Sequence, residues 1–314
     1  MKILFIADPL DSFKLSKDST YAMMVEAAKR GHDLYFSLQE GLMWKGGRVL
    51  AECRRISLTG ATGSWYRSDA AGEAPIAGFD AVLMRKDPPF DVEYVASTWL
   101  LEQAQAEGAK VFNDPRAVRD HSEKLAIARY AEFTVPTLVT RLDAQVHEFI
   151  DAQGDVVLKP LDGMGGASIF RVGAHDPNRN VIVETLLDDG RKSVMAQRYI
   201  PEIREGDKRI LLIAGEPVPH CLARIPRPGE TRGNLAAGGT GVAKPLSKRD
   251  LEIAHALGPG LAEQGLLLVG QDVIGEFLTE INVTSPTCFQ EITQQTGFSV
   301  AGMFLDALEA ACAA

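Results

Sequence analysis

Residues 158–169 have the sequence Leu-Lys-Pro-Leu-Asp-Gly-Met-Gly-Gly-Ala-Ser-Ile, which predicts a strand, a glycine-rich turn and a second strand. Glycines at Gly163, Gly165 and Gly166 would let backbone N–H groups approach phosphate oxygens without a Cβ in the way. The segment is not a P-loop, because Lys159 precedes the glycines and no helix is predicted after them. An ordinary glycine-rich hairpin is the alternative, and the rest of the chain has to decide between the two.

The size and charge of the chain narrow the class of protein. Its 314 residues are enough for two or three domains, and 46% apolar with 24% charged residues is typical of globular proteins. A net charge of -9 works against a general nucleic-acid or anionic-membrane surface. No apolar run is long enough for a membrane span, and Asp8 interrupts the start where a signal peptide would be apolar. We therefore expect a cytoplasmic protein without a membrane partner.

The N-terminal part predicts a doubly wound parallel sheet. Residues 2–7 form an apolar run, typical of a strand buried on both faces, and a helix and a second strand over residues 32–36 follow. No G-x-G-x-x-G follows the first strand, so a dinucleotide site is not indicated. A further strand over residues 80–84 would bring Arg85 to the carboxyl edge, where open α/β sheets bind ligands. Arg85 is thus a candidate anion contact.

Three polar features lie in the middle of the chain. Lys124 falls near the start of a predicted helix over residues 122–133, where a solvated lysine is the ordinary interpretation. A functional role would require it to face Lys159 across a nucleotide, which spacing alone cannot establish. Residues 195–201 predict an apolar strand that passes into a connector, with backbone groups available to an adenine edge. Asp207 could accept hydrogen bonds from ribose hydroxyls or serve as a plain turn residue.

An acidic group near the C-terminus predicts a metal site. Residues 266–283 predict a β-hairpin, in which Glu280 and Asn282 share one face by the period of two. A three-residue turn at 275–277 would place Asp272 opposite Glu280, whereas a two-residue turn would make Asp272 face away. Oxygen ligands on one face suit Mg²⁺. The alternative, a solvated polar face, fits poorly with such apolar flanks, because carboxylates there need a cation or donors.

A long polar loop follows Arg224. It combines basic residues with several glycines, and it predicts a flexible lid over residues 225–240 that closes over anionic ligands and excludes water. A disordered surface loop is the alternative, although loops of this length in compact domains are often functional.

Together these segments resemble the prokaryotic glutathione synthetase family of the ATP-grasp superfamily. The resemblance is carried by residues 84–91, 159–166, 230–239 and 279–287, and it spans nearly the whole chain. It implies an α/β ATP-grasp fold, in which an N-terminal doubly wound parallel-sheet domain is followed by two α+β domains that clasp ATP. The domains expected are an N-terminal α/β domain over residues 1–121, a central ATP-grasp lid domain over 122–196, and a C-terminal ATP-grasp domain with the metal site over 197–314.

The resemblance also implies an activity and residue roles. The activity is ATP-dependent ligation of γ-glutamylcysteine with glycine through an acyl phosphate, which gives glutathione, ADP and phosphate. ATP would be bound by Lys124, Lys159, Gly163, Gly165, Gly166, Gln197, Arg198, Tyr199, Ile200 and Asp207. Two Mg²⁺ ions, or Mn²⁺, would be held by Asp272, Glu280 and Asn282. Arg209 and Arg224 would stabilise the acyl phosphate and tetrahedral intermediate, and Arg85, Arg232, Ser285, Pro286 and Thr287 would hold substrate groups.

Two other functions stay open at this point. One is another ATP-grasp carboxylate–amine ligase with different substrates, against which the Arg85 loop and the turn at 285–287 argue by resemblance. The other is a nucleotide-binding protein without catalysis, which the intact lysines and oxygen donors disfavour. The resemblance further implies a homo-oligomer, in the form of a tetramer.

Overall fold

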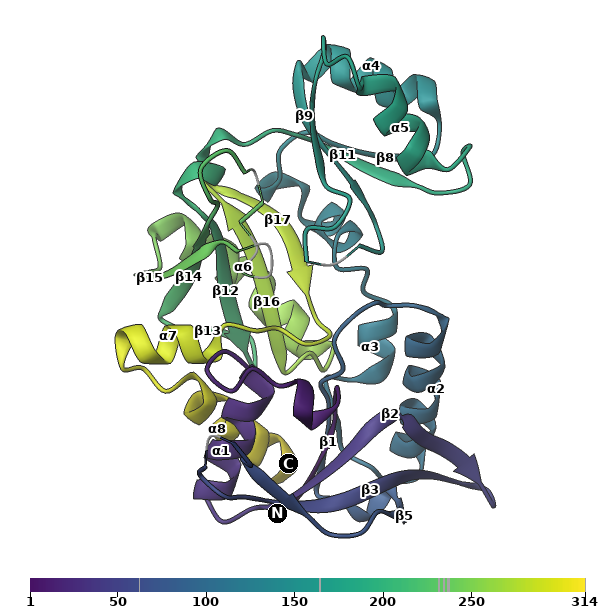
Figure 1. The fold of residues 1–314 in the computed structure, drawn as a ribbon, viewed down its shortest axis with the longest axis vertical. Coiled ribbons are helices and arrows are strands. Elements are labelled where there is room, and N and C mark those ends of the chain that lie inside the picture. The colour runs from purple at the N-terminus through teal and green to yellow at the C-terminus, as the bar shows by residue number, and fades with distance from the viewer. Residues whose placement is uncertain (62, 164, 231, 234, 236–237, 314) are drawn as a thin grey trace.

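The structure is a computed structural model that describes residues 1–61, 63–163, 165–230, 232–233, 235 and 238–313. Parts of the predicted phosphate turn and lid lie outside the described residues, namely Met164, Thr231, Asn234, Ala236 and Ala237. In the described part the strands form three sheets, with helices packed against them (Figure 1). Among the described helices, none has the length and hydropathy that crossing a bilayer requires.

The first sheet has a parallel centre with helices on both faces. Its parallel strands are β2 (Asp33–Lys45), β1 (Lys2–Ile6), β6 (Ala81–Met84) and β7 (Val111–Phe112), in that order. Ile3 and Phe5 share a core with α1 (Ser19–Lys29), whereas Leu4 and Ile6 share one with α2 (Val92–Ala106). Because successive side chains of a strand point to opposite faces, this apolar strand is covered on both sides. The doubly wound arrangement is the predicted one.

An antiparallel extension of this sheet was not predicted. β2 turns through Gly46 and Gly47 into β3 (Arg48–Leu58), which also pairs with β4 (Tyr66–Ser68) and β5 (Gly72–Pro75). Both glycines have positive φ, 61° and 80°. Such a Gly-Gly pair is a strong hairpin signal. The Gly46-Gly47 pair was therefore a sequence signal for this long hairpin. The hairpin extends to one side of the molecule (Figure 1).

The second sheet is antiparallel, and helices cover one of its faces. Its strand order is β10 (Phe170–Gly173), β9 (Asp155–Pro160), β11 (Val194–Arg198), β8 (Thr137–Thr140). The helices α4 (Asp143–Gln153) and α5 (Arg179–Leu187) share its apolar core. The sheet lies at the top of Figure 1, above the site described below.

The helix predicted over residues 122–133 is instead a 3₁₀ segment, η3 (Leu125–Phe133), with non-helical backbone at Tyr130. One physical reason lies at its start. The carbonyl of Glu123 accepts a hydrogen bond from Ile281 N at 2.9 Å, on the last strand of the third sheet. Tertiary pairing of this carbonyl takes the place of the helical i to i+4 bond.

The third sheet is also antiparallel. Its main order is β15 (Thr240–Pro245), β14 (His220–Ile225), β12 (Asp207–Ile213), β16 (Leu268–Ile274), β17 (Phe277–Asn282), and β13 (Glu216–Pro217) pairs with β12. The helix α6 (Lys248–Glu263) packs against it. The last helices, α7 (Phe289–Thr296) and α8 (Val300–Ala313), return to α1, so the two ends of the chain lie close together (Figure 1). The shorter elements are η1 (Leu10–Ser12), η2 (Ile76–Gly78), α3 (Pro115–Arg119) and η4 (Pro201–Glu205).

The hairpin of β16 and β17 corrects one step of the sequence reasoning. Its turn has two residues, 275–276, so the predicted three-residue turn is wrong. Asp272 nevertheless pairs with Glu280, because the strand register shifts between Asp272 and Val273 and Thr279 is the extra residue of a β-bulge. The Thr279 hydroxyl donates to the Asp272 carbonyl at 3.1 Å. The predicted opposition of the two carboxylates is confirmed, and the bulge supplies the shift that the longer turn was expected to give.

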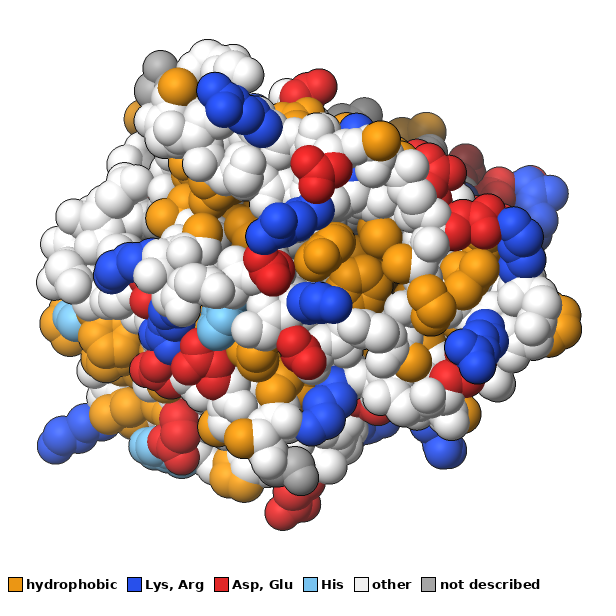
Figure 2. Space-filling view, turned by 90° about the horizontal axis from the view of Figure 1, so that it is seen from below, with side chains coloured by type: hydrophobic (Ala, Val, Ile, Leu, Met, Phe, Trp, Pro, Cys, Tyr) orange, Lys and Arg blue, Asp and Glu red, His pale blue; other side chains and the backbone are white. Residues whose placement is uncertain are grey.

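The surface seen from below carries acidic and basic side chains intermixed with apolar ones (Figure 2). The three sheets use residues within 2–112, 137–198 and 207–282. The domain boundaries after residues 121 and 196 stay a prediction.

Candidate active site

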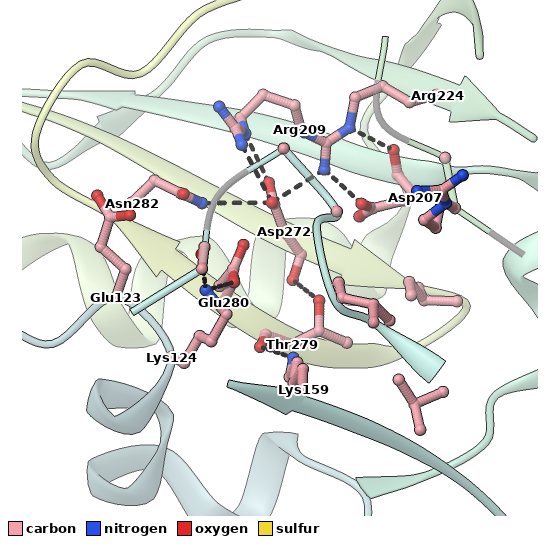
Figure 3. Close-up of a pocket in the computed structure, with 18 of the residues that line it drawn as sticks. Glu123, Lys124, Lys159, Asp207, Arg209, Arg224, Asp272, Thr279, Glu280 and Asn282 are labelled. Carbon is pink, nitrogen blue, oxygen red and sulfur yellow. Dashed lines mark hydrogen bonds and ion pairs between the residues drawn. The ribbon is translucent and has the colours of Figure 1, made fainter. Parts of the chain in front are cut away.

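A pocket of about 320 Å³ lies where the second and third sheets face each other (Figure 3). It is lined by parts of β9, β11, β12, β14, β16 and β17 and by the turn that follows β17. The predicted site residues that line it are Lys124, Lys159, Gly163, Gly165, Gly166, Gln197, Arg198, Tyr199, Ile200, Asp207, Arg209, Arg224, Arg232, Asp272, Glu280, Asn282, Ser285, Pro286 and Thr287. The structure thus brings together segments that are far apart in the sequence.

Two buried lysines reach the hairpin of β16 and β17, which is the predicted metal site. Lys124 is 5% exposed, and its Nζ lies 3.1 Å from Glu280 Oε1 and donates to Gly163 O at 2.5 Å. Lys159 is 7% exposed and donates to Thr279 O at 3.3 Å. Burial lowers the pKa of Lys159, although Glu280 acts in the opposite direction. Lys124 is therefore not the solvated lysine of the ordinary interpretation, and both lysines line the pocket.

Arginine–aspartate pairs line the wall opposite the lysines. Asp272 accepts from Arg209 Nε at 2.5 Å and Nη2 at 3.0 Å, and its Oδ2 lies 2.9 Å from Arg224 Nη2. Arg224 Nη2 also donates to Asp207 Oδ2 at 2.5 Å. Burial opposes ionisation of Asp272, but the two guanidinium groups hold its pKa below the usual range. Breaking such a buried pair would leave an uncompensated charge, which costs about 3–5 kcal/mol.

Asp207 has one oxygen without a partner. Its Oδ1 is buried and accepts no hydrogen bond from the described residues. Burial raises the pKa of Asp207 to about 6, even though Arg224 acts to lower it. A buried acceptor left unbonded costs about 1–3 kcal/mol. A hydroxyl donor from a ligand would satisfy this oxygen, which supports the ribose contact over the plain turn residue.

The connector after β11 offers a backbone donor. The backbone N–H groups of Arg198 and Tyr199 donate to the carbonyls of Pro136 and Asp155, at 3.0 and 2.9 Å. That of Ile200 has no hydrogen-bond partner in the described part of the chain. An adenine edge placed here would therefore meet a free donor at Ile200, directly after two residues whose backbone N–H groups are already bonded.

The oxygen donors of the hairpin fit a hard divalent cation only together with a phosphate ligand. Asp272 and Glu280 face each other, and Asn282 Nδ2 donates to Asp272 Oδ2 at 3.3 Å and to Gly270 O at 3.2 Å. Within the described residues, no three His, Cys, Asp or Glu side chains gather closely enough to hold a metal on their own. Mg²⁺ commonly uses one or two carboxylates with phosphates and water, and the donor set fits that mode of binding.

The turn after β17, which the sequence predicts to hold substrate, lines one part of the pocket. The Ser285 hydroxyl donates to the carboxylate of Asp87. Arg85 is not among the described residues that line the pocket. It is 6% exposed, and its Nη2 donates to Pro286 O at 2.8 Å and its Nε to Thr20 Oγ1 at 3.3 Å. Arg85 therefore supports the turn from behind.

The loop predicted to act as a lid approaches Asp207 and Arg224 at Gly233. It joins the adjacent strands β14 and β15, and Arg232, Gly233 and Leu235 line the pocket. A Cβ at Gly233 would come within 3.1 Å of Asp207 Cβ, so the glycine allows close contact. Arg232 pairs with Glu230 at 2.7 Å.

Several polar residues of the pocket were given no role in the sequence interpretation of the site. Glu123, Asp87 and Thr284 line the cavity and belong to no spacing pattern that periodicity would detect. Cys288, which also lines the pocket, is 1% exposed and free, and burial raises its pKa. Proximity to Lys124 in the sequence was the one signal that could have pointed to Glu123.

Comparisons with known proteins agree along the whole chain. The family model for the prokaryotic glutathione synthetase N-terminal domain matches residues 1–119, and that for the ATP-grasp domain of the same family matches residues 123–297. The glutathione synthetase of Ralstonia nicotianae is 64% identical, over 99% of this chain and 96% of the relative. Those of Nitrosomonas europaea and Neisseria meningitidis serogroup A are 60% and 55% identical, each over 98% of both chains.

Solved structures share the fold. D-cycloserine synthetase DcsG has a TM-score of 0.67 at 17% identity, covering 98% of this chain and 99% of its own. The ATP-grasp ligase PsnB, complexed with a minimal precursor, Mg and ADP, has a TM-score of 0.63 at 19% identity, covering 100% and 98%. At such low identity the likeness extends to the fold alone.

Proposed function

The chain belongs to the prokaryotic glutathione synthetase family, and on that premise we propose how its residues carry out the ligation. It is an ATP-dependent ligase that forms glutathione from γ-glutamylcysteine and glycine. One observation carries the assignment of roles. Lys124 lies in the segment before the second sheet, and Lys159 lies on β9 of that sheet. Both line one pocket together with Asp272 and Glu280 of the third sheet.

The first half of the reaction is phosphoryl transfer. The cysteinyl carboxylate of the dipeptide attacks the γ-phosphorus of ATP, the bond to the ADP oxygen breaks, and an acyl phosphate forms. Lys124, Lys159 and the turn at 163–166 bind the phosphates. Positioning and charge stabilisation supply most of the catalysis in such a transfer.

The second half is acyl transfer to an amine. The neutral amine of glycine attacks the acyl carbon, its nitrogen loses a proton, and phosphate leaves from the tetrahedral intermediate. Arg209 and Arg224 lie with buried guanidinium groups on the pocket wall and stabilise the oxyanion. The lid over residues 225–240 keeps water from the acyl phosphate.

We assign Asp272, Glu280 and Asn282 to two Mg²⁺ ions, with Mn²⁺ as the alternative ion. When bound, the ions neutralise the charge of the phosphates. Asp207 and the connector at 197–200 hold the ribose and adenine. Arg232 and the turn at 285–287 hold substrate groups, and Arg85 acts through that turn.

The partners are small molecules. We propose further that the enzyme is a cytoplasmic homo-oligomer, a tetramer by likeness to the family, and that it binds neither nucleic acid nor membrane. The net charge of -9 supports the last point. Light scattering after gel filtration tests the tetramer, which a monomeric mass would exclude.

The proposed function is tested by ADP release against a panel of carboxylate and amine substrates. ADP should form rapidly only with γ-glutamylcysteine and glycine together. If another amine served while glycine did not, the chain would be a different carboxylate–amine ligase. ATP binding without turnover across the panel would make it a non-catalytic nucleotide-binding protein.

A further inference from the structure

Glu123 presents a carboxylate to the pocket that the reaction described above does not use. Its Oε1 accepts from Val283 N at 3.0 Å, from Thr284 N at 3.3 Å and from Thr284 Oγ1 at 2.9 Å. These bonds fix the side chain against the end of β17. Within the described residues, no hydrogen bond or ion pair involves Oε2, and Glu123 lines the pocket. One oxygen is thus anchored and the other is available to a ligand.

Glu123 differs from the three pocket carboxylates of the third sheet in having no cation. Asp87, a further pocket carboxylate, likewise forms no ion pair in the described part of the chain and accepts a hydrogen bond from Ser285. Glu280 pairs with Lys124, and Asp272 and Asp207 pair with arginines. Glu123 forms no such pair in the described part of the chain. Burial raises its pKa, and the nearby carboxylate of Glu280 adds to that effect. A buried carboxylate without a cation is costly, so this position favours a positively charged ligand.

A second polar group near Glu123 is also unsatisfied. The hydroxyl of Tyr94 is buried, and it has no hydrogen-bond partner among the described residues. Burial raises the pKa of Tyr94, and the charge of Glu123 is the next largest cause. Two polar groups in this region, Glu123 Oε2 and the Tyr94 hydroxyl, thus have no hydrogen-bond partner among the described residues.

The place of Glu123 in the pocket indicates which ligand group it meets. Figure 3 shows it beside Asn282, at the opposite end from Asp207. Its anchoring residues lead directly into Ser285, at the substrate turn. Glu123 therefore lies where the β16–β17 hairpin meets the turn predicted to hold substrate, and the acyl phosphate must form at this junction.

We propose that Glu123 Oε2 binds the ammonium group of the incoming acceptor amino acid, glycine, and places its nitrogen beside the acyl carbon. The ammonium gives one proton to an oxygen of the acyl phosphate, the neutral amine attacks the acyl carbon, the nitrogen releases a second proton to solvent, and hydrogen phosphate leaves. The inference rests on the proposed function. The dipeptide has an ammonium group too, but it lies at the far end of the γ-glutamyl chain, several bonds from the reacting cysteinyl carboxylate. The attacking amine, by contrast, must reach the acyl carbon itself.

The variant Glu123→Gln separates this role from the structural one. The amide oxygen of glutamine can keep the three bonds from residues 283 and 284, while its NH₂ replaces Oε2 and presents donors to an ammonium group. We expect the KM for glycine to rise at least about tenfold, with the KM values for ATP and γ-glutamylcysteine within about twofold of wild type.

Hydroxylamine gives a second readout. It is largely uncharged at neutral pH and attacks acyl phosphates to give a hydroxamate. In Glu123→Gln, hydroxamate formation from ATP and γ-glutamylcysteine should stay within about twofold of wild type, because this nucleophile brings no ammonium group to bind. A purely structural defect would reduce hydroxamate and glutathione formation together.

Thr284→Val is the matched control, because it removes one bond that anchors Glu123 and keeps the carboxyl group itself. Thr284→Val should lower the thermal stability, and it should not raise the KM for glycine selectively. Three results for Glu123→Gln would each overturn the inference. They are an unchanged KM for glycine, a rise in the KM for the dipeptide alone, and equal rises in the KM values for all substrates. If the wild type itself released no ADP with both substrates, the proposed function would fail first, and this inference with it.

Discussion

Lys124 Nζ lies 3.1 Å from Glu280 Oε1, and this ion pair joins the segment that leads into the second sheet to the last strand of the third. Lys124 also donates to Gly163 O, so a single ammonium group contacts the glycine turn and the β16–β17 hairpin. The side chain of Lys124 is only 6% exposed and that of Glu280 is 21% exposed. The two partners therefore face a common cavity, in which a triphosphate would find a cation and oxygen donors side by side.

Glu280→Gln should impair catalysis far more than folding. The amide keeps the size of the side chain but removes the charge proposed to hold a metal ion. We expect turnover at saturating Mg²⁺ to fall about 100-fold, which corresponds to about 2.7 kcal/mol. Steady-state kinetics and a thermal melt measure the two effects. Unchanged turnover would remove Glu280 from the metal site.

Lys159→Met should weaken nucleotide binding. The methionine fills a similar volume in the buried position but leaves the phosphates without this charge. Calorimetric titration with ADP should show an affinity at least about tenfold lower, since charged hydrogen bonds contribute about 1.5–3 kcal/mol. Lys192→Met, at an exposed position near the second sheet, is the control and should bind ADP like the wild type. Equal affinities in all three proteins would contradict the phosphate role of Lys159.

Gly233→Ala should disturb closure of the lid. The added Cβ would come within 3.1 Å of Asp207 Cβ and still closer to the Arg224 carbonyl, so the loop would have to move. We expect ADP release to exceed glutathione formation, because the acyl phosphate becomes open to water. Pro228→Ala, at an exposed position of the same loop, should keep the two rates equal. A Gly233→Ala enzyme that kept them equal would argue against the lid.

His121 should make the protein sensitive to acid. It is 4% exposed, neither ring nitrogen has a partner in the described part, and burial lowers its pKa to about 4, with Arg129 adding to that effect. Between about pH 4 and 6.5 the unfolded chain binds a proton that the folded chain does not, so stability falls as pH falls through this window.

We therefore compare the unfolding free energy of His121→Leu with that of the wild type at two pH values. The difference should favour the variant more at low pH than at pH 8. At pH 5 the relative gain should be about 2 kcal/mol. Urea unfolding at both values measures it. His255→Gln, at an exposed position on α6, should show no such gain. A stability difference between His121→Leu and wild type that is independent of pH would show that the histidine is not held neutral.

The sequence indicated that Lys159 and the glycine turn belong to one local feature, and the structure places them on the pocket, because the signals there are local. The order of Lys159 and the three glycines distinguishes the turn from a P-loop within a few residues. The apolar runs of β1 and β6 likewise indicate buried parallel strands from their own composition.

Other features depended on tertiary contacts that no local pattern contains. The bulge at Thr279 is an extra residue in one strand, and it is visible only through its partner strand. The 3₁₀ form of η3 follows a hydrogen bond to the distant Ile281, and the position of Arg85 behind the turn follows its bond to Pro286. Glu123 has no motif of its own, and its importance becomes evident only where the chain places it.

The central claim is that Lys124 and Lys159 and the oxygen donors of the β16–β17 hairpin bind one triphosphate. The most direct measurement is a crystal structure with a non-hydrolysable ATP analogue and Mn²⁺, located by anomalous scattering. The account predicts manganese peaks within about 2.0–2.3 Å of oxygens from Asp272, Glu280 and Asn282, with both lysines on the phosphates. A nucleotide bound elsewhere, or manganese that does not touch these residues, would contradict it.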